Sequence, residues 1–346
     1  MTGQERGKLV DQLLEKIQPE HLELQQLFCA QPPPLQRWVA MQREHLELAG
    51  GETSSLQQSF AAGLRAPAMG YAFFAGYQSA ISRLLGVHYC ADALYALCVT
   101  ESSGNSPAVI ETQLLPGAGA AGVGEDAQRR LLHGTKTFVT GGELVDRLLV
   151  LAVDEYLPEG RKAFSLVDLP LATVSREKMK ISTLPALPVV PEIPHCAIRF
   201  DHLPVHSGQV LPGEGYDKYV RRFRWLEDTH VLAALSGFLH SVGRYWQSRD
   251  LVALSLGLFN GISSLGGVPD SSLGEVSGAG GSAVVVYGWL TRQLALALPG
   301  ILAGVATEHE EQAQRITRDI AVLKVARSAR ERREEKVWSA WQITPT

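Results

Sequence analysis

Three hydroxyl-bearing side chains stand at the ends of two predicted strands in the stretch from Leu97 to Val153. Thr100 and Ser106 follow the first strand, in LCVTESSGNS, and Thr140 ends the second, in LHGTKTFVTGG. Alternating β-branched and apolar residues predict the strands, and the Gly and Ser residues beside them predict turns. Hydroxyls and exposed backbone at neighbouring strand ends suit a flat cofactor that carries phosphate.

A glycine-rich loop joins these two strands. Gly117, Gly119 and Gly122, in PGAGAAGVG, satisfy the pattern GxGxxG. That pattern binds dinucleotides only where it joins a strand to the start of a helix inside a βαβ unit. The segment that follows, GEDAQRRLLHG, is short and runs directly into another strand. We therefore interpret the loop as a flexible hairpin connection.

The composition is that of an ordinary globular protein. A length of 346 residues allows two or three domains, and 45% hydrophobic with 20% charged residues provides for a substantial core. The net charge of −4 gives no reason to expect a nucleic-acid partner. No run of about eighteen apolar residues indicates a membrane span. The charged, helix-patterned N-terminus is unlike a secretory signal.

Cysteines and histidines give no sign of a metal site. Cys29, Cys90, Cys98 and Cys196 lack CxxC spacing, so we interpret them as buried free thiols in a reducing cytoplasm. The ten histidines show no ligand spacing, and the chain has no GxSxG nucleophile motif. We therefore expect neither a bound metal nor a nucleophilic serine.

Hydrophobic periodicity predicts helices on both sides of the strands. Residues 9–17 repeat leucine and isoleucine at helical spacing, and residues 59–85 are rich in small and apolar side chains. An apolar stripe predicts a long helix over 225–242. The Gly- and Ser-rich segment 254–282 is predicted as a loop. Two further helical stretches are predicted at 283–305 and 308–341, and we expect the segment ARERREEK in the second to form a solvated face with i,i+4 pairing.

Three segments of the chain resemble the acyl-CoA dehydrogenases. TESSGNS, from Thr100 to Ser106, resembles the family's TEPGAGSD strand end, and GTKTFVTGG, from 134 to 142, resembles GxKxWITNG. AIRFDHLPV, from 197 to 205, is similar to the strand that leaves the family's middle domain. The resemblance implies an α+β multidomain fold with an N-terminal helical domain (1–95), a middle β-barrel domain (96–206) and a shortened C-terminal helical bundle (207–346).

The resemblance also implies FAD as cofactor. Thr100 would donate to the pyrimidine side of the isoalloxazine ring and Thr140 toward N5, because negative charge gathers there on reduction. Ser106 would meet the pyrophosphate. Phe138 stands where the family has a tryptophan against the ring, and Arg249 resembles a flavin-contacting arginine, although no Phe-Gly follows it.

Several motif positions depart from the family pattern. Asn105 replaces a glycine, Pro107 an aspartate, and Gly141 an asparagine. These changes alter turn geometry and remove polar contacts. Three alternatives follow: FAD is bound weakly, it is shared with a second subunit that completes the site, or it has been lost.

Glu227 is the candidate base that the resemblance implies. The family's reaction removes the α-proton of an acyl thioester while a hydride leaves the β-carbon, so it requires a carboxylate over the α-carbon. Most members take it from a C-terminal EGT-like segment, which this sequence lacks. A minority, including isovaleryl-type enzymes, takes it from an LER-like segment, which Leu226, Glu227 and Asp228 resemble.

Asp228 stands where that segment has arginine, which makes it a candidate substrate-side residue. A negative charge there would remove a cation and raise the pKa of a neighbouring base. The alternative is that both are ordinary acidic side chains near the start of a helix, where the dipole favours negative charge.

Two functional hypotheses result. The first is flavin-dependent α,β-dehydrogenation of an acyl thioester, bound to CoA or to a carrier protein. The second is a non-catalytic or flavin-free subunit that binds an acyl thioester or completes a heteromeric dehydrogenase. The expected partners are the acyl thioester, an electron-transfer protein or paralogous subunit, and further copies in a homo- or hetero-oligomer. We expect a cytoplasmic protein of lipid metabolism, with neither nucleic acid nor membrane as partner.

Overall fold

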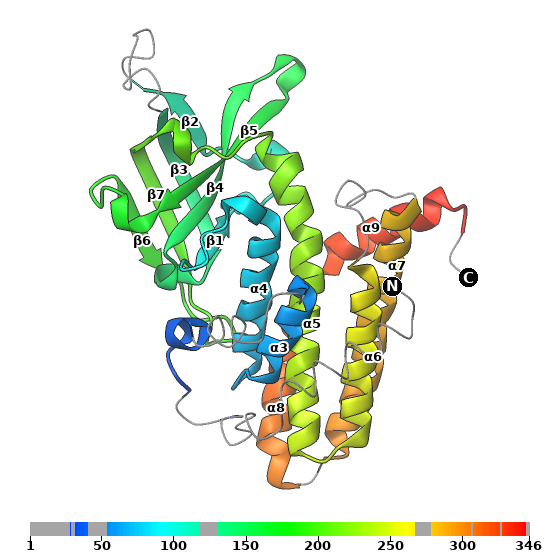
Figure 1. Ribbon diagram of the computed structural model, residues 1–346. Helices are drawn as coiled ribbons and strands as arrows, with labels where there is room; N and C mark the ends of the chain where they lie inside the picture. Colours follow the sequence, from blue (N-terminus) through cyan, green and yellow to red (C-terminus); the bar gives the residue numbers. More distant parts are fainter. Residues whose placement is uncertain are drawn as a thin grey trace. The chain divides into compact units, whose positions relative to one another are not determined.

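The described chain forms two compact units (Figure 1). The computed structural model describes Phe28 and residues 32–40, 54–117, 130–266, 278–305, 307–325 and 327–343. The sheet unit is drawn from Leu84–Leu187 and Ile193–Arg224. The helix unit is drawn from Met1–Arg83, Pro188–Glu192 and Trp225–Thr346, so helices before and after the sheet share one unit. The domain boundaries at residues 95 and 206 remain predictions.

The sheet unit is built on a seven-stranded mixed sheet. Its strands are β1 (Tyr95–Cys98), β2 (Gln113–Pro116), β3 (Arg130–Thr140), β4 (Arg147–Tyr156), β5 (Lys162–Pro170), β6 (Met179–Thr183) and β7 (His195–Val205). The strand order is β1-β4-β2-β3-β7-β6, and β5 pairs with β4. The predicted β-rich middle region is therefore confirmed.

Strand β4 forms the centre of the apolar core of this unit. Every side chain from Leu148 to Val153 is at most 2% exposed. An unbroken apolar run of this kind is what a strand buried on both faces requires. β4 pairs with β1, β2 and β5, so it connects the first strand of the sheet to the strand before the glycine-rich loop and to β5.

The interpretation of the glycine-rich loop as a hairpin is confirmed by its flanking strands. β2 and β3 are antiparallel neighbours, with Gln113 opposite His133 and Pro116 opposite Arg130. A dinucleotide-binding βαβ unit would need parallel strands and a helix between them. Gly119 and Gly122 lie outside the described residues, as does the helical pattern predicted over residues 9–17.

The helix unit contains α3 to α9. Their bounds are α3 (Ser55–Leu64), α4 (Met69–Leu85), α5 (Arg221–Tyr245, entering from the sheet unit), α6 (Arg249–Leu265), α7 (Gly278–Ala303), α8 (Glu310–Asp319) and α9 (Arg327–Ala340). The predicted long helix is α5. Glycines set its spacing from α3: a Cβ on Gly63 would lie 1.9 Å from the Ala234 oxygen, and one on Gly237 would lie 2.1 Å from the Phe60 oxygen.

The predicted loop over 254–282 is wrong where the structure describes it. Helix α6 continues to Leu265, and α7 begins at Gly278. Glycine costs a helix about 1 kcal/mol relative to alanine, but Leu258, Phe259 and Ile262 are almost fully buried at helical spacing, and burial of such side chains contributes about 1.5–3 kcal/mol each. Packing therefore outweighs the weak helix propensity of the glycines.

Helix α7 runs against the expectation that no apolar segment is long enough to span a membrane. Among the described helices, its segment Gly280–Ala303 is long and apolar enough to cross a membrane by length and composition alone, with a mean hydropathy of 1.3. Arg292 in the middle of α7 pairs with Glu334 of α9 at 2.8 and 2.9 Å, and 22% of the apolar window is buried within the structure.

The cysteine interpretation is partly correct. Cys98 and Cys196 are buried free thiols, and burial raises the pKa of both, that of Cys196 to about 11. Cys90 is exposed, because it lies in the turn that precedes β1 rather than on a strand. Cys29 lies outside the described residues.

Candidate functional site

The ends of β1 and β3 lie side by side in the sheet unit. The backbone N–H of Thr137 donates to the Thr100 oxygen at 2.8 Å, so Thr100 lies beside the last residues of β3. Thr140 is the final residue of that strand. Thr100 and Thr140 are half-buried and Ser106 is exposed. All three hydroxyl side chains predicted from sequence therefore remain accessible.

The hydroxyls of these three residues are available to a ligand. Within the described part of the chain, the side chains of Thr100, Ser106 and Thr140 make no hydrogen bond. Two other threonines of the same unit do: Thr173 donates to the Pro170 oxygen at 3.0 Å, and Thr183 donates to Glu143 at 3.3 Å. A hydroxyl is both donor and acceptor, so this edge offers unused donors.

A β-bulge turns Phe138 outward at this edge. Thr137 and Phe138 of β3 stand opposite the single residue Ala197 of β7, between the pairs Lys136–Ile198 and Val139–Cys196. Phe138 has a φ of 53° and is 56% exposed. A left-handed backbone costs a non-glycine residue about 1–2 kcal/mol. Bulges that re-aim one strained side chain are typical of functional sites.

The departure from the family pattern at Gly141 has a backbone explanation. Gly141 and Gly142 follow β3 with φ values of 90° and 55°, both in the left-handed region. Asparagine and glycine are the residues that tolerate this region best. The Gly141 N–H donates to the Pro194 oxygen at 2.9 Å, which keeps the turn beside Thr140 closed.

A buried ion pair, to which sequence reasoning gave no role, lies beneath this edge. Lys136 of β3 is 0% exposed and its Nζ lies 2.7 Å from Oε1 of Glu101. The same Nζ donates to the Val99 oxygen at 3.3 Å. The Glu101 carboxylate also accepts the backbone N–H groups of Glu111 at 2.8 Å and Thr112 at 3.0 Å. In the sequence, the only sign of this pair is that Lys136 occupies a strand position whose side chain points into the core.

Each member of the pair opposes the effect of burial on the pKa of the other. Burial raises the pKa of Glu101, but the charge and hydrogen bond of Lys136 and the contacts from Thr112 outweigh it, so the pKa lies below its ordinary value. Burial lowers the pKa of Lys136, and Glu101 opposes that change. Since Lys136 also binds the Val99 oxygen, the pair fixes the backbone that presents Thr100.

A tight turn then leads to Ser106. Glu101 and Gly104 exchange backbone hydrogen bonds of 2.8 and 2.9 Å, and Gly104 has a φ of 119°. Arg224 donates to the Asn105 oxygen at 3.3 Å. Ser106 then precedes a short 3₁₀ turn, Pro107–Val109. Ser106 therefore sits on a defined loop rather than on a strand.

In the helix unit, Glu227 and Asp228 have different environments. Both lie in the second turn of α5, where Glu227 is half-buried and Asp228 is 7% exposed. Asp228 accepts from Arg330 at 2.9 Å and from Arg333, both on α9. The negative charge of Asp228 is thus compensated by two arginines. The expected solvated face of ARERREEK is wrong for these arginines, because they turn inward to bind a carboxylate.

A cavity adjoins this ion-pair network. It has a volume of about 1120 Å³ and lies between α7, α8 and α9, with leucines of α7 on its walls and cationic side chains at its margin. Tyr287 lines it, and the Tyr287 hydroxyl is buried without a hydrogen-bond partner in the described part of the chain. Burial and the charge of Asp228 raise the pKa of Tyr287, so its hydroxyl stays protonated.

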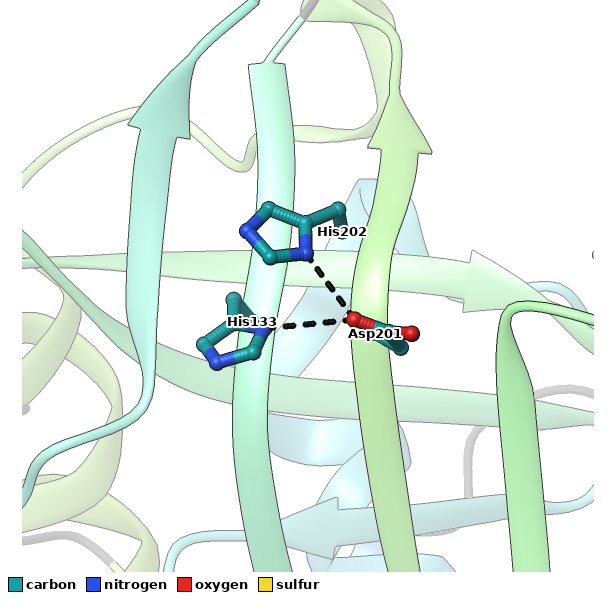
Figure 2. Close-up of side chains that lie close together, drawn as sticks. All are labelled: His133, Asp201 and His202. Carbon is teal, nitrogen blue, oxygen red and sulfur yellow. Dashed lines mark hydrogen bonds and ion pairs between the residues drawn. The ribbon is translucent and has the colours of Figure 1, made fainter.

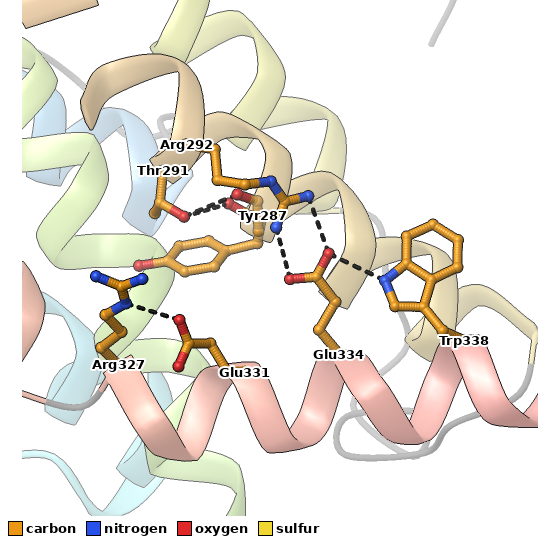
Figure 3. A network of polar contacts seen from close by, with 8 residues as sticks. Tyr287, Thr291, Arg292, Arg327, Glu331, Glu334 and Trp338 are labelled. Atoms are coloured by element: carbon orange, nitrogen blue, oxygen red, sulfur yellow. Dashed lines mark hydrogen bonds and ion pairs between the residues drawn. The ribbon is translucent and has the colours of Figure 1, made fainter. Parts of the chain in front are cut away.

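Figure 3 shows how α7 and α9 are joined beside Tyr287. Glu334 accepts from Arg292 and from the Trp338 indole, and Arg327 pairs with Glu331 on α9. These contacts satisfy the neighbouring charges, and no acceptor for the phenol lies among the described residues. Apolar residues of α7 line the cavity together with polar and charged residues of α8 and α9.

Comparison with known proteins identifies the fold. Neither a family model nor a curated protein sequence matches the chain. Butyryl-CoA dehydrogenase from Megasphaera elsdenii matches in structure with a TM-score of 0.66 and 15% identity, over 99% of each chain. The chain has the acyl-CoA dehydrogenase fold. The expected fold class is thereby confirmed.

Other proteins with the acyl-CoA dehydrogenase fold bind different ligands. The FAD complex of PigA matches with a TM-score of 0.62 and 12% identity, over 92% of this chain and 91% of that one. A complex of TdsC from Paenibacillus sp. A11-2 with FMN and indole matches with a TM-score of 0.64 and 12% identity, over 90% of each chain. The fold therefore does not determine the substrate, which depends on the residues of the site.

Arg249 lies far from Glu227 in this acyl-CoA dehydrogenase fold. Arg249 is the exposed first residue of α6, directly after the N-cap Ser248. The helix α5 separates it from Glu227, and eighteen residues of helix at 1.5 Å each span about 27 Å. The two residues cannot touch one small substrate, so a flavin contact at Arg249 remains a prediction.

Proposed function

We propose that this protein is a flavin-dependent dehydrogenase that forms a double bond between the α- and β-carbons of an acyl thioester. One observation carries the proposal: the hydroxyls of Thr100, Ser106 and Thr140, on a scaffold with this fold, have no partner in the described part of the chain. The donor set fits FAD, since the ring positions N1, O2 and N5 and the phosphate oxygens accept hydrogen bonds.

Five residues of the chain would hold the cofactor in this proposal. When bound, FAD supplies a two-electron acceptor for the hydride from the β-carbon. Thr100 and Thr140 would donate to the ring, Ser106 would donate to the pyrophosphate, and the exposed ring of Phe138 would offer a flat apolar face. Arg249 would pair with a phosphate of the flavin bound by its own chain or by a second copy of the chain.

Glu227 takes the α-proton onto its carboxylate. A second-turn position on α5 holds the side chain on a rigid element, and the paired Asp228 anchors that helix to α9. We propose Asp228 as a substrate-side residue that acts mainly through this anchoring. The net products would be an enoyl thioester, two protons and two electrons, and the two electrons would pass to an electron-transfer partner.

The test separates cofactor binding from proton abstraction. General-base catalysis contributes about 10²–10⁴-fold, so we expect Glu227→Gln to lower the dehydrogenation rate with an acyl-CoA and an artificial electron acceptor by that factor. FAD content should be unchanged. Glu335→Gln, at an exposed site on α9, is the matched control. Full activity in Glu227→Gln would contradict the assignment of the base.

The second candidate is a non-catalytic or flavin-free subunit that binds an acyl thioester or completes a paralogous dehydrogenase. It is favoured by Pro107, which stands at the first position of the turn after Ser106 and has no N–H to give to a phosphate. Isolated protein that stays colourless with FAD but restores activity to a paralogous subunit would establish this role. Cytoplasmic location, lipid metabolism and an oligomeric state belong to both proposals.

A further inference from the structure

Three metal-ligating side chains converge on the sheet unit, away from the residues proposed for flavin. His133 lies on β3, and Asp201 and His202 lie on β7 (Figure 2). Each offers one ligand atom, and the three atoms lie within 4.8 Å of one another. His133 precedes Thr140 by seven strand residues, about 20 Å at the usual rise, so this cluster is a separate site.

A second β-bulge produces the convergence. Leu132 pairs with Leu203 and Gly134 with Phe200, so His133 alone stands opposite the two residues Asp201 and His202. His202 has a φ of 51°, in the left-handed region. The extra residue on β7 turns the side chains of both Asp201 and His202 toward His133, whereas regular pairing would place one of them on the opposite face of the sheet.

The distances suit a tetrahedral ion. With bonds of about 2.0–2.1 Å, neighbouring ligand atoms of tetrahedral zinc lie about 3.3 Å apart. Nδ1 of His202 lies 2.9 Å from Oδ1 of Asp201, and Nδ1 of His133 lies 3.8 Å from the same oxygen. These two separations bracket the ideal value. Imidazole nitrogens and a carboxylate oxygen are also the ligands that zinc takes in proteins.

One ring nitrogen of the cluster is left unsatisfied. Nδ1 of His133 is shielded from solvent and has no hydrogen-bond partner in the described part of the chain. It points toward Asp201 without reaching hydrogen-bond distance. The two imidazole rings are close, with centroids 4.3 Å apart. A shared ion would satisfy this nitrogen and bridge the gap between the rings.

The surroundings allow access to the cluster. The side chains of His133, Asp201 and His202 are 41%, 55% and 50% exposed, so an ion can enter and the rings can adjust. Lys178 and Arg199 place positive charge near Asp201. Those two cations also oppose a bound cation, which limits the affinity to that of a surface site.

We propose that His133, Asp201 and His202 bind one divalent transition-metal ion, with Zn²⁺ as the favoured ion. Three protein ligands leave a fourth position open to water or a small anion. The ion would cross-link β3 to β7 at the bulge. Sequence spacing does not reveal the site, because Asp201 follows His133 by 68 positions in the chain.

The experiment is a calorimetric titration of chelator-treated full chain with Zn²⁺, repeated with Co²⁺ to read its visible absorption. His202→Asn is the central variant, because asparagine tolerates the left-handed backbone and removes the imidazole. His133→Gln removes the other ring. His88→Ala, at an exposed histidine of the same unit, is the matched control.

We expect one ion per wild-type chain, tetrahedral Co²⁺ absorption and a zinc-dependent rise in Tm. Both ligand variants should weaken binding at least about tenfold, the loss expected for a metal site deprived of a supporting group, and His88→Ala should bind as wild type. The proposal is overturned if the wild-type chain binds no ion, if either ligand variant binds as well as wild type, or if His88→Ala loses binding equally.

Discussion

Replacing Lys136 by methionine tests whether the buried ion pair supports the sheet edge. The substitution removes the only cation within hydrogen-bond distance of the Glu101 carboxylate among the described residues, at 2.7 Å, from a site where the two side chains are 0% and 8% exposed. Removing one partner of a buried pair costs about 3–5 kcal/mol, because the remaining charge is left uncompensated. At about 2–4 °C per kcal/mol, Tm should fall by about 10 °C.

The assay is thermal unfolding followed by calorimetry, with FAD retention measured in parallel. Lys180→Met, at an exposed position of β6, controls for the chemistry of the replacement and should shift Tm by less than about 2 °C. The double variant Glu101→Gln with Lys136→Met should recover most of the loss, since no charge remains buried. Equal Tm values for Lys136→Met and Lys180→Met, or a double variant less stable than both single ones, would refute the reasoning.

The remaining predictions concern the helix unit. A Cβ on Gly63 would lie 1.9 Å from a backbone oxygen of α5, so Gly63→Ala should destabilise by at least about 1–3 kcal/mol, while Gly257→Ala, in open space, should be neutral or stabilising in the same unfolding assay. Burial, helped by neighbouring arginines, lowers the pKa of His230 and His240 to about 4. In the unfolded chain these histidines bind protons near pH 6.5, whereas in the folded chain they do not. The free energy of unfolding should therefore be at its full value above about pH 7 and should fall by about 2 kcal/mol per histidine at pH 5. A flat free energy of unfolding between pH 7 and 5 would contradict this. Asp228→Asn should leave Arg330 and Arg333 without a carboxylate partner and lower the free energy of unfolding, measured with urea, by about 3 kcal/mol. An unchanged urea midpoint would show that these ion pairs are solvated.

Local patterns predicted the elements that carry the candidate site. The strand ends at Thr100 and Thr140 and the helix around Glu227 follow from alternation and from an apolar stripe, which are properties of neighbouring residues. The helix α6 was missed because its glycines and serines resemble a loop, whereas its buried face decides the structure. Local propensity is a weak guide where tertiary packing dominates.

The contacts between elements were beyond prediction from one sequence. The partners of Asp228 lie more than one hundred residues away on α9, and Lys136 finds Glu101 across the sheet. The left-handed backbones of Phe138 and His202 arise from bulges, which depend on strand register rather than on residue type. Such features become visible only when two strands or helices are placed together.

The most direct test of the central claim is a visible-absorbance titration of the purified chain with FAD. We expect bound flavin that persists through gel filtration, and affinity that falls about five- to tenfold in Thr100→Val and in Thr140→Val, the effect of losing one net hydrogen bond of about 1 kcal/mol. Thr173→Val, whose hydroxyl already binds the Pro170 oxygen, should bind as wild type. A chain that stays colourless at every FAD concentration, or threonine variants with unchanged affinity, would contradict the account.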